Sequence, residues 1–340
     1  MTPFDPNAAA AAGSGAFGLT CSPDEARVVL IPVPFEATTS YGGGTVDGPR
    51  AIREASKQVD LFDLETGRPY EGGIAMLEEP AEVRAWNNEA RALAMPIIEA
   101  GGADPEHKLP AINALCDRMN EWVRNTVASW LSKGKLVGTV GGDHSVPFGA
   151  IQAHAERYPG MAVVHLDAHA DLREAYEGFT WSHASIMFNV AQRIPKVSQV
   201  AQVGIRDFCE AEHALIQGSG GRIVTHFDAE LSRRRFDGEA WNAQVARMVE
   251  GLPKDVYLSF DIDGLDPTLC PSTGTPVPGG LSFQEACALV AGVVRSGRRI
   301  VGFDLNEVAP SPDGGEWDGN VGARLLYKMI GWALTSQPAR

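Results

Sequence analysis

The sequence has 340 residues, 44% of them apolar, and a formal net charge of −14 at pH 7. This length and apolar content allow a large buried core, and the negative charge excludes a binder of nucleic acid or of anionic membranes. No apolar stretch approaches the roughly 20 residues that span a bilayer. The five cysteines are scattered and the start of the chain lacks the features of a signal peptide, which predicts a cytoplasmic protein with reduced thiols.

Strand-like and helix-like patterns alternate along the chain after residues 1–24, which we expect to form a flexible or partner-wrapping arm. Apolar runs predict strands at 27–33, 135–140, 161–166, 199–204, 222–226, 255–260 and 299–305. Amphipathic patterns predict helices at 48–58, 110–132, 147–157, 183–193, 210–217, 238–250, 283–296 and 319–334. Alternation of this kind predicts an α/β protein with a mainly parallel sheet covered on both faces. No linker interrupts the pattern, so residues 25–340 are expected to form a single domain.

Short signals mark some helix ends. One apolar stripe runs along the helix at 110–132, and Gly134 follows it as a C-terminal stop. Ser282 and Glu285 have the spacing of a capping box, which predicts the start of the helix at 283–296.

Three short polar segments each follow an apolar strand: Gly141-Gly-Asp-His-Ser145, Asp167-Ala-His-Ala-Asp171 and Asp261-Ile-Asp263. Alternate side chains of an extended chain share a face, so the polar residues of each segment are expected to point the same way. The carboxyl ends of parallel strands meet at one edge of a sheet. The segments therefore predict a single site with six candidate metal ligands: His144, Asp167, His169, Asp171, Asp261 and Asp263.

Imidazole and carboxylate ligands in this number exceed what one zinc ion needs and suit two divalent ions. Carboxylates favour Mn²⁺, and imidazole also suits Ni²⁺. A water between two such ions becomes a nucleophile near neutral pH, so hydrolysis is the expected reaction. Each segment alone has another interpretation: a turn, a solvated strand end, or a calcium loop, whose later acidic ligand the chain lacks. The combination of all three favours a metal site.

The same segments, with Gly302-Phe-Asp-Leu-Asn-Glu-Val-Ala-Pro310, resemble the ureohydrolase (arginase/agmatinase) family over about residues 26–335. The resemblance implies a three-layer α/β/α sandwich and a single ureohydrolase catalytic domain. It also implies a centre of two divalent metal ions, usually Mn²⁺, that cleaves guanidino groups to urea and an amine. Many members are trimers or hexamers, so a homo-oligomer is expected.

The resemblance also assigns roles beyond the metal ligands. Glu307 falls on the family's guanidinium anchor and His183 on its proton-transfer histidine, and these two residues with Asp171 are the expected catalytic residues. A carboxylate suits a planar cation, and histidine titrates near neutrality. Each of the two also has a non-catalytic interpretation: Glu307 as a residue at a helix start, and His183 as a residue that makes a polar contact.

The expected substrate follows from departures from the common family patterns. The segment 172–182 is bulky and aromatic where arginases have small polar residues, so arginine is not the expected substrate. Trp317 is a candidate roof for a short pocket, or else a packing residue, and Thr180 is a further candidate at the pocket wall, beside His183 and Glu307. These features resemble the branch of guanidine and alkylguanidine or metformin-type hydrolases, which is associated with nickel.

We therefore expect hydrolysis of a small cationic guanidino substrate: guanidine, an N-alkylguanidine or a biguanide. Three alternatives stay open. The chain could act as an agmatinase or guanidinobutyrase, or as a non-catalytic subunit beside a homologous partner subunit in a mixed oligomer. A deacetylase-like amidohydrolase with one zinc fits less well, because the third segment would then be surplus.

Overall fold

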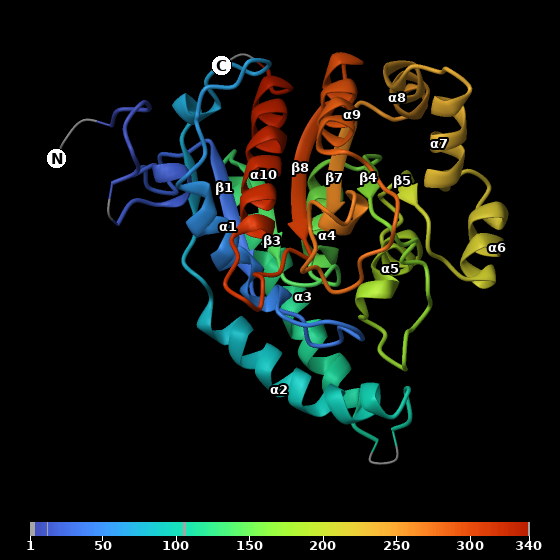
Figure 1. Cartoon of the computed structure of the whole chain (residues 1–340). Coiled ribbons are helices and arrows are strands. Elements are labelled where there is room, and N and C mark those ends of the chain that lie inside the picture. The colour runs from blue at the N-terminus through green and yellow to red at the C-terminus, as the bar shows by residue number, and fades with distance from the viewer. Residues whose placement is uncertain (1–3, 12, 105–106, 339–340) are drawn as a thin grey trace.

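Eight parallel strands form the centre of the molecule in a computed structural model that describes residues 4–11, 13–104 and 107–338 (Figure 1). Their order across the sheet is β2-β1-β3-β8-β7-β4-β5-β6. The strands are β1 Val28–Val33, β2 Ile74–Met76, β3 Leu136–Gly141, β4 Ala162–Leu166, β5 Gln199–Ile205, β6 Ile223–Phe227, β7 Asp255–Asp261 and β8 Arg299–Asn306. Parallel strands place all their carboxyl ends at the same edge, where a site can form.

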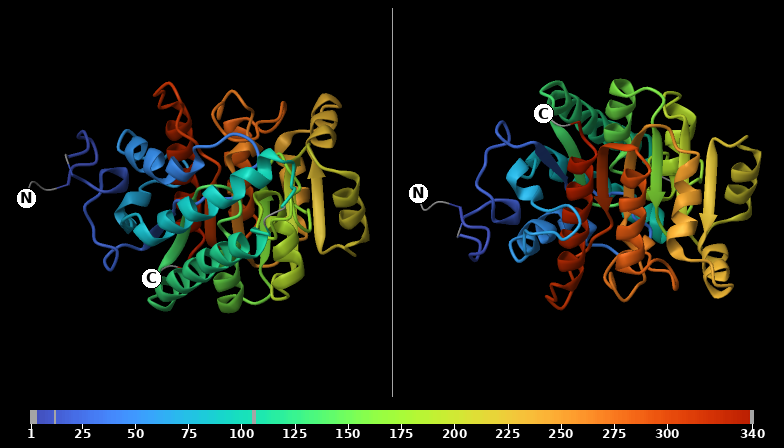
Figure 2. Two further views of the ribbon diagram at one scale, coloured as in Figure 1. Left: turned by 90° about the horizontal axis from the view of Figure 1, so that it is seen from below. Right: turned by 90° about the horizontal axis from the view of Figure 1, so that it is seen from above.

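Helices cover both faces of this sheet, as the two views of Figure 2 show. The α-helices are α1 Gly48–Ser56, α2 Ala81–Glu99, α3 Leu109–Ser132, α4 Phe148–Arg157, α5 Ile186–Arg193, α6 Glu210–Gly218, α7 Asp228–Phe236, α8 Trp241–Glu250, α9 Phe283–Arg295 and α10 Trp317–Thr335. Short 3₁₀ helices are η1 Ala16–Gly18, η2 Thr45–Asp47, η3 Pro69–Gly72, η4 His183–Ser185 and η5 Ile262–Gly264.

Two hydrophobic cores lie on opposite faces of the sheet. Buried residues of α1, α8, α9 and α10 pack in one core, and those of α2, α3, α4 and α5 pack in the other. The strands are almost entirely buried because both of their faces are covered. The predicted three-layer α/β/α sandwich is therefore confirmed.

The predicted helix signals act as expected. The side chain of Ser282 accepts the backbone N–H of Glu285, and the Glu285 carboxylate accepts the Ser282 N–H, which completes a capping box at the start of α9. Gly134 has a φ of 73°, a left-handed conformation that ends α3 without the steric cost of a side chain.

Among the strands and α-helices of the described residues, three were not predicted from the sequence. Strand β2 has three residues, too few for a recognisable pattern. Helix α2 carries Pro96 in its interior, a residue that normally indicates a break. Helix α7 is strongly polar and buries one residue, Leu231, so it has no apolar stripe to detect.

Part of the N-terminal segment packs against the domain. Phe17, only 2% exposed, donates its backbone N–H to Ser56 of α1, and its ring lies 5.0 Å from that of Tyr327 in α10. Residues 16–19 are thus held on the core, while the division of the chain at residue 25 stays a prediction.

The five cysteines are free thiols. Among the described residues, no helix has the length and apolar character needed to cross a membrane.

Candidate active site

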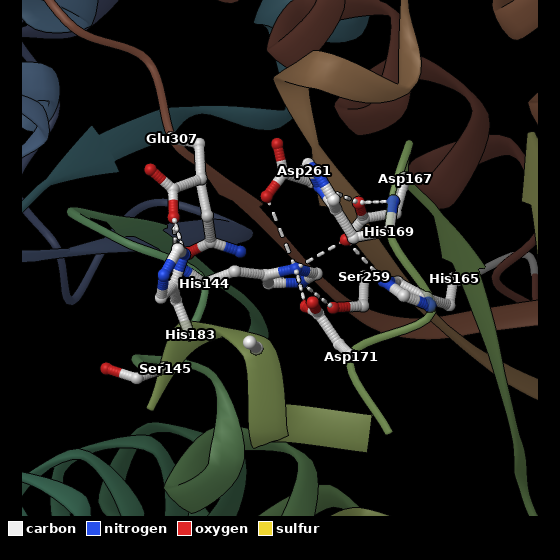
Figure 3. Close-up of polar contacts among 12 residues, drawn as sticks. His144, Ser145, His165, Asp167, His169, Asp171, His183, Ser259, Asp261 and Glu307 are labelled. Carbon is white, nitrogen blue, oxygen red and sulfur yellow. Dashed lines mark hydrogen bonds and ion pairs between the residues drawn. The ribbon is translucent and has the colours of Figure 1, made fainter. Parts of the chain in front are cut away.

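The three predicted segments meet at the carboxyl edge of the sheet, at the ends of strands β3, β4 and β7 (Figure 3). His144 is buried at the centre of the group. Its Nδ1 lies 2.9 Å from Asp167, 3.1 Å from Asp171 and 3.4 Å from Asp261, each distance measured to a carboxylate oxygen. Ligands that are far apart in the sequence therefore share one small volume.

A second group adjoins the first. The Nδ1 of His169 lies 3.1 Å from an oxygen of Asp263 and 3.4 Å from an oxygen of Asp167. The ligand atoms of His144, Asp167 and Asp171 could surround one ion, and those of Asp167, His169 and Asp263 a second. Asp167 belongs to both groups, which is the arrangement of a carboxylate shared by two ions.

The local backbone differs from the extended chain on which the prediction relied. Asp261 ends β7, but Asp263 lies inside η5, a turn that is fixed by a 2.9 Å hydrogen bond from the Asp263 N–H to the Asp261 carboxylate. Asp171 has a φ of 54°, in the left-handed region. Turns, not strand alternation, orient these side chains within their segments, so that part of the expectation was wrong, whereas the segments meet at the carboxyl edge of the sheet as expected.

The electrostatics of the group show an excess of negative charge. Burial raises the pKa of Asp171 to about 7, and the charge of Asp167 acts in the same direction. Burial and the charge of Asp263 raise the pKa of Asp261 well above its usual range. Burial opposes protonation of His169, but the charges of Asp263 and Asp167 outweigh it and raise the pKa of that imidazole to about 12.

These shifts reflect the crowding of buried carboxylates and histidines in one small volume. Four buried carboxylates repel one another and draw protons onto nearby histidines, and divalent ions would neutralise the same charge. The oxygen and nitrogen donors suit Mn²⁺ or Ni²⁺. The residues present therefore fit a pair of divalent ions, with His144, Asp167, Asp171 and Asp261 beside one position and Asp167, His169 and Asp263 beside the other.

Glu307 follows β8, which lies between β3 and β7, and thus reaches the same edge. It is 1% exposed and has a φ of 62°. Its Oε1 accepts the backbone N–H of His144 at 2.9 Å, whereas its Oε2 is buried without a hydrogen-bond partner among the described residues. An unpaired buried carboxylate oxygen is costly unless a cation binds it.

His183 begins η4 and lies beside Glu307. Its Nδ1 is 3.6 Å from the Glu307 carboxylate, and its Nε2 is 3.2 Å from the hydroxyl of Ser40. Burial alone would lower the pKa of His183, but the hydrogen bond and charge of Glu307 raise it. This histidine can therefore hold a proton beside the Glu307 carboxylate at near-neutral pH.

A cavity of about 500 Å³ opens onto this group. His169, Asp171 and His183 lie in its wall, together with Ser40, Tyr41, Arg173, Tyr176, Ala184, Asp207, Phe208, Glu212, Thr275, Pro276 and Val277. The cavity is therefore continuous with both candidate ion positions and with the candidate proton-transfer histidine.

Two predicted wall residues lie elsewhere. Trp317 begins α10, is 53% exposed and donates its indole N–H to the carbonyl of Thr268, so it does not line the cavity. Thr180 also lies outside the cavity lining, and its backbone groups bond to Asn113 and Asn189. Neither placement supports contact with a substrate.

The aromatic 172–182 segment divides between the core and the cavity. Trp181 is 8% exposed and packs on Phe148, with ring centroids 4.7 Å apart. Tyr176 and Arg173 are its cavity-lining members. Part of the bulk that argued against arginine is therefore core packing.

Several polar residues of the site were not identified from the sequence. Ser259 donates to Asp304 of β8, so its oxygen accepts the 3.0 Å hydrogen bond from Nε2 of His144. His165 lies 2.7 Å from Asp167. Each of these residues is a polar side chain inside an otherwise apolar strand, and that pattern could have marked them.

Comparisons with known proteins agree with this geometry. Residues 26–331 match the model of the arginase family. The chain is 34% identical to an N(1)-aminopropylagmatine ureohydrolase of Thermus thermophilus over 310 residues, covering 91% of this chain and 90% of that one. It is 31% identical to the agmatinase of Bacillus anthracis, with coverages of 91% and 93%.

Solved structures share the fold. The proclavaminate amidino hydrolase of Streptomyces clavuligerus has a TM-score of 0.74 at 23% identity, with coverages of 97% of this chain and 100% of that one. The arginase of Medicago truncatula has a TM-score of 0.69 at 23% identity, with coverages of 91% and 88%.

The fold and the sequence together define a hydrolase that acts on linear amidines, a ureohydrolase. The chain belongs to the arginase family.

Proposed function

We propose that this chain cleaves the guanidino group of an alkylguanidine with a terminal amine, as an agmatinase-type ureohydrolase, and releases urea and a diamine or polyamine. The observation that carries the proposal is the cavity, whose wall contains both His183 and Asp207. Its volume of about 500 Å³ falls within the usual range for sites of medium-sized ligands. Free guanidine, with four heavy atoms, would leave most of that space to water.

Asp207 offers a further carboxylate in the cavity wall for the amine. Its side chain is exposed and has no hydrogen-bond or ion-pair partner within the described part of the chain. A second carboxylate in the same cavity favours a substrate with a second positive charge. The relatives named above act, by their names, on agmatine and aminopropylagmatine, which carry such an amine.

The residues around the guanidinium divide the work between binding and proton transfer. The buried Oε2 of Glu307 accepts N–H groups of the guanidinium, and Oε1 stays fixed by the His144 N–H. His183 holds a proton beside Glu307 and passes it, at Nε2 or through the Ser40 hydroxyl, to the nitrogen that leaves. Two divalent ions, when bound, would supply Lewis acidity and lower the pKa of a water, so that its hydroxide form is available to attack the guanidinium carbon.

The donor set favours Mn²⁺ because most of its ligand atoms are carboxylate oxygens. Ni²⁺ is the alternative to test beside it. We propose that the chain is itself catalytic and not a silent subunit of a mixed oligomer, because all six candidate ligands are present and converge.

The test is release of urea, or of guanylurea from the biguanide metformin, by the purified chain loaded with Mn²⁺ or Ni²⁺. The panel contains agmatine, N(1)-aminopropylagmatine, 4-guanidinobutyrate, arginine, guanidine, dimethylguanidine and metformin. We expect the highest kcat/KM for the two amine-bearing alkylguanidines. Dominant turnover of guanidine, dimethylguanidine or metformin would overturn the proposal in favour of a small-guanidine hydrolase.

A matched variant makes the test specific. Asp207→Asn should lower kcat/KM for agmatine by about tenfold, roughly the 1.4 kcal/mol of one charge-assisted contact. Guanidine has no second charge, so the same substitution should leave its turnover unchanged. An equal effect on both compounds would show that Asp207 does not bind the amine.

A further inference from the structure

We infer that a buried row of polar side chains beneath the candidate metal centre positions its ligands, and that His165 acts in this row as a positioning residue for Asp167 and not as a metal ligand. The row consists of Asp304, Ser259, His165, Gln202 and Thr225 and is called the polar row below. The inference rests on the metal centre of the proposed function.

The polar row is set by strand register. Asp304 of β8 is paired with Ser259 of β7, Ser259 with His165 of β4, His165 with Gln202 of β5, and Gln202 with Thr225 of β6. Residues paired across neighbouring strands point to the same face of a sheet. Five adjacent strands thus place one polar side chain each in a single line, in a sheet whose strand interiors are otherwise mainly apolar.

Side-chain hydrogen bonds join the neighbouring members at each end of the polar row. Thr225 donates to Oε1 of Gln202 at 2.8 Å, and the Gln202 amide nitrogen lies 3.0 Å from Nδ1 of His165. At the other end, Ser259 donates to Asp304 at 3.0 Å. Asp304, Ser259, His165 and Gln202 are each 0% exposed. Bonds so deeply buried are not exchanged for water, so the geometry that they impose is rigid.

The orientation of the Gln202 amide follows from its other contact. Its nitrogen also donates to the carbonyl oxygen of Ala170 at 2.6 Å, and a backbone carbonyl can only accept. The amide nitrogen must therefore face His165, so Nδ1 of that imidazole accepts and Nε2 carries the hydrogen. Nε2 lies 2.7 Å from Oδ2 of Asp167, to which it donates.

Both nitrogens of His165 are thereby engaged. His165 is close enough to His144, Asp167 and Asp171 to be considered a ligand of the same ion. However, Nδ1 already accepts from Gln202, and Nε2 has no lone pair to give while it donates to Asp167. The geometry assigns His165 to the support of a ligand.

The supported ligand is the one that both candidate ion positions share. Oδ2 of Asp167 accepts from His165, and Oδ1 accepts the backbone N–H of His169 at 2.6 Å. One hydrogen bond on each oxygen fixes the plane of the carboxylate. The remaining lone pairs of Oδ2 and Oδ1 then face the His144 group and the His169 group respectively.

The experiment measures Mn²⁺ binding to the full chain after removal of metal with a chelator. Gln202→Glu exchanges the donor at Nδ1 of His165 for an acceptor with little change in shape. Loss of such a supporting contact typically weakens metal affinity 10- to 100-fold, and we expect a loss of about that size here. Gln199→Glu is the matched control, because Gln199 is at the start of the same strand and bonds to Gly221. We expect it to bind Mn²⁺ like the wild type.

A second pair of variants separates support from ligation. His165→Gln keeps an N–H donor for Asp167 and His165→Leu does not, so the first should retain part of the affinity that the second loses. Both should still bind two ions per chain at saturating Mn²⁺. A fall from two ions to one in both variants would show that His165 is a ligand and would overturn the inference.

If Gln202→Glu does not fold, as judged by circular dichroism, Thr225→Val becomes the test of the positioning role. This substitution removes the hydrogen bond from Thr225 to the Gln202 amide at the edge of the polar row. Its expected effect is about a three- to tenfold weakening, less than that of a direct contact. Wild-type affinity in the folded variant overturns the positioning role. Absence of Mn²⁺ binding by the wild-type chain would instead overturn the metal centre itself, so the two failures are distinguishable.

Discussion

Glu307 and His144 are joined by a hydrogen bond of 2.9 Å between the carboxylate of the first and the backbone N–H of the second. The predicted anchor of the substrate and a predicted metal ligand are thus fixed to each other, although they follow different strands. A second bond, 2.8 Å from the Glu307 N–H to the Gly142 carbonyl, holds the same two segments together. The proposed substrate position and the proposed metal position therefore depend on the same pair of strand ends.

This relationship predicts the effect of Glu307→Gln. The amide keeps an oxygen for the His144 N–H but loses the charge that binds a guanidinium. We expect kcat/KM for agmatine to fall about 100-fold, near 2.7 kcal/mol, while two Mn²⁺ ions still bind. Steady-state kinetics with metal analysis of the same sample checks this. Glu316→Gln, in the exposed loop before α10, is the control. Loss of metal in Glu307→Gln would contradict a role confined to the substrate.

Removal of a ligand charge should act on metal and activity together. Asp261→Asn should lower urea release by at least about 100-fold and reduce the bound Mn²⁺ below two ions per chain, because that carboxylate is buried beside His144. Elemental analysis after dialysis measures the occupancy. Asp266→Asn offers a control in the same sequence segment, since Asp266 only caps a turn through Thr268. Full activity in Asp261→Asn would refute its assignment as a ligand.

The N-terminal segment should contribute to stability through one ring. Phe17→Ala removes a buried aromatic side chain that packs on Tyr327, and we expect the free energy of unfolding to fall by about 3 kcal/mol. Phe4→Ala, at a ring that is 44% exposed, should cost less than about 1 kcal/mol. Urea denaturation of both variants measures the difference. Equal losses would mean that residues 16–19 do not anchor the segment.

The ion pair between Asp63 and Lys328 predicts a pH dependence of stability away from the active site. Burial opposes ionisation of Asp63, but Lys328 and Thr66 outweigh it and lower the pKa of the carboxyl below its usual value. A lowered folded-state pKa stabilises the protein above the unfolded value, near 4, and that contribution is lost as pH falls through the folded value.

Lys328 is the opposite case. Burial opposes its charge, but Asp63 outweighs burial and raises the pKa of the ammonium, so its contribution disappears only at high pH. Asp63→Asn should therefore be less stable than the wild type by roughly 1 kcal/mol from about pH 5 to 10, with the difference vanishing near pH 2. Urea unfolding of metal-free samples across this range checks it. A difference that stays constant down to pH 2 would contradict the ionic origin.

The strands and the ligand set were predictable because each rests on a strong local signal. Apolar runs ending in Asp, His or Glu mark both a buried parallel strand and a polar residue at its carboxyl end. Helix α7 was missed because it buries Leu231 alone, and strand β2 was missed because it has three residues. Neither leaves a periodic pattern in the sequence. In these two elements the sequence lacks the alternation of apolar and polar residues that marks a helix or strand with one buried face. Their residues do not lack helical or extended propensity.

The walls of the cavity were less predictable than its floor. Trp181 and Trp317 are of a residue type suited to a pocket wall. However, Trp181 packs on Phe148, and Trp317 is hydrogen-bonded to Thr268, so both side chains are directed elsewhere. Asp207 carried no recognisable motif, and only the tertiary structure places it in the same cavity as His183. Side-chain direction in loops depends on such contacts, so sequence patterns identify the reaction better than the substrate.

The order of the strands has a consequence for how the protein is made. Strand β8 is the last in the chain, yet it lies between β3 and β7 at the centre of the sheet. A nascent chain that has left the ribosome only as far as residue 298 contains strands β3 and β7 but not β8, the strand that lies between them. Because synthesis proceeds from the N-terminus, the ends of these strands cannot be brought to their final distance until the last tenth or so of the chain leaves the ribosome. Metal uptake should accordingly follow completion of the polypeptide and not accompany its elongation.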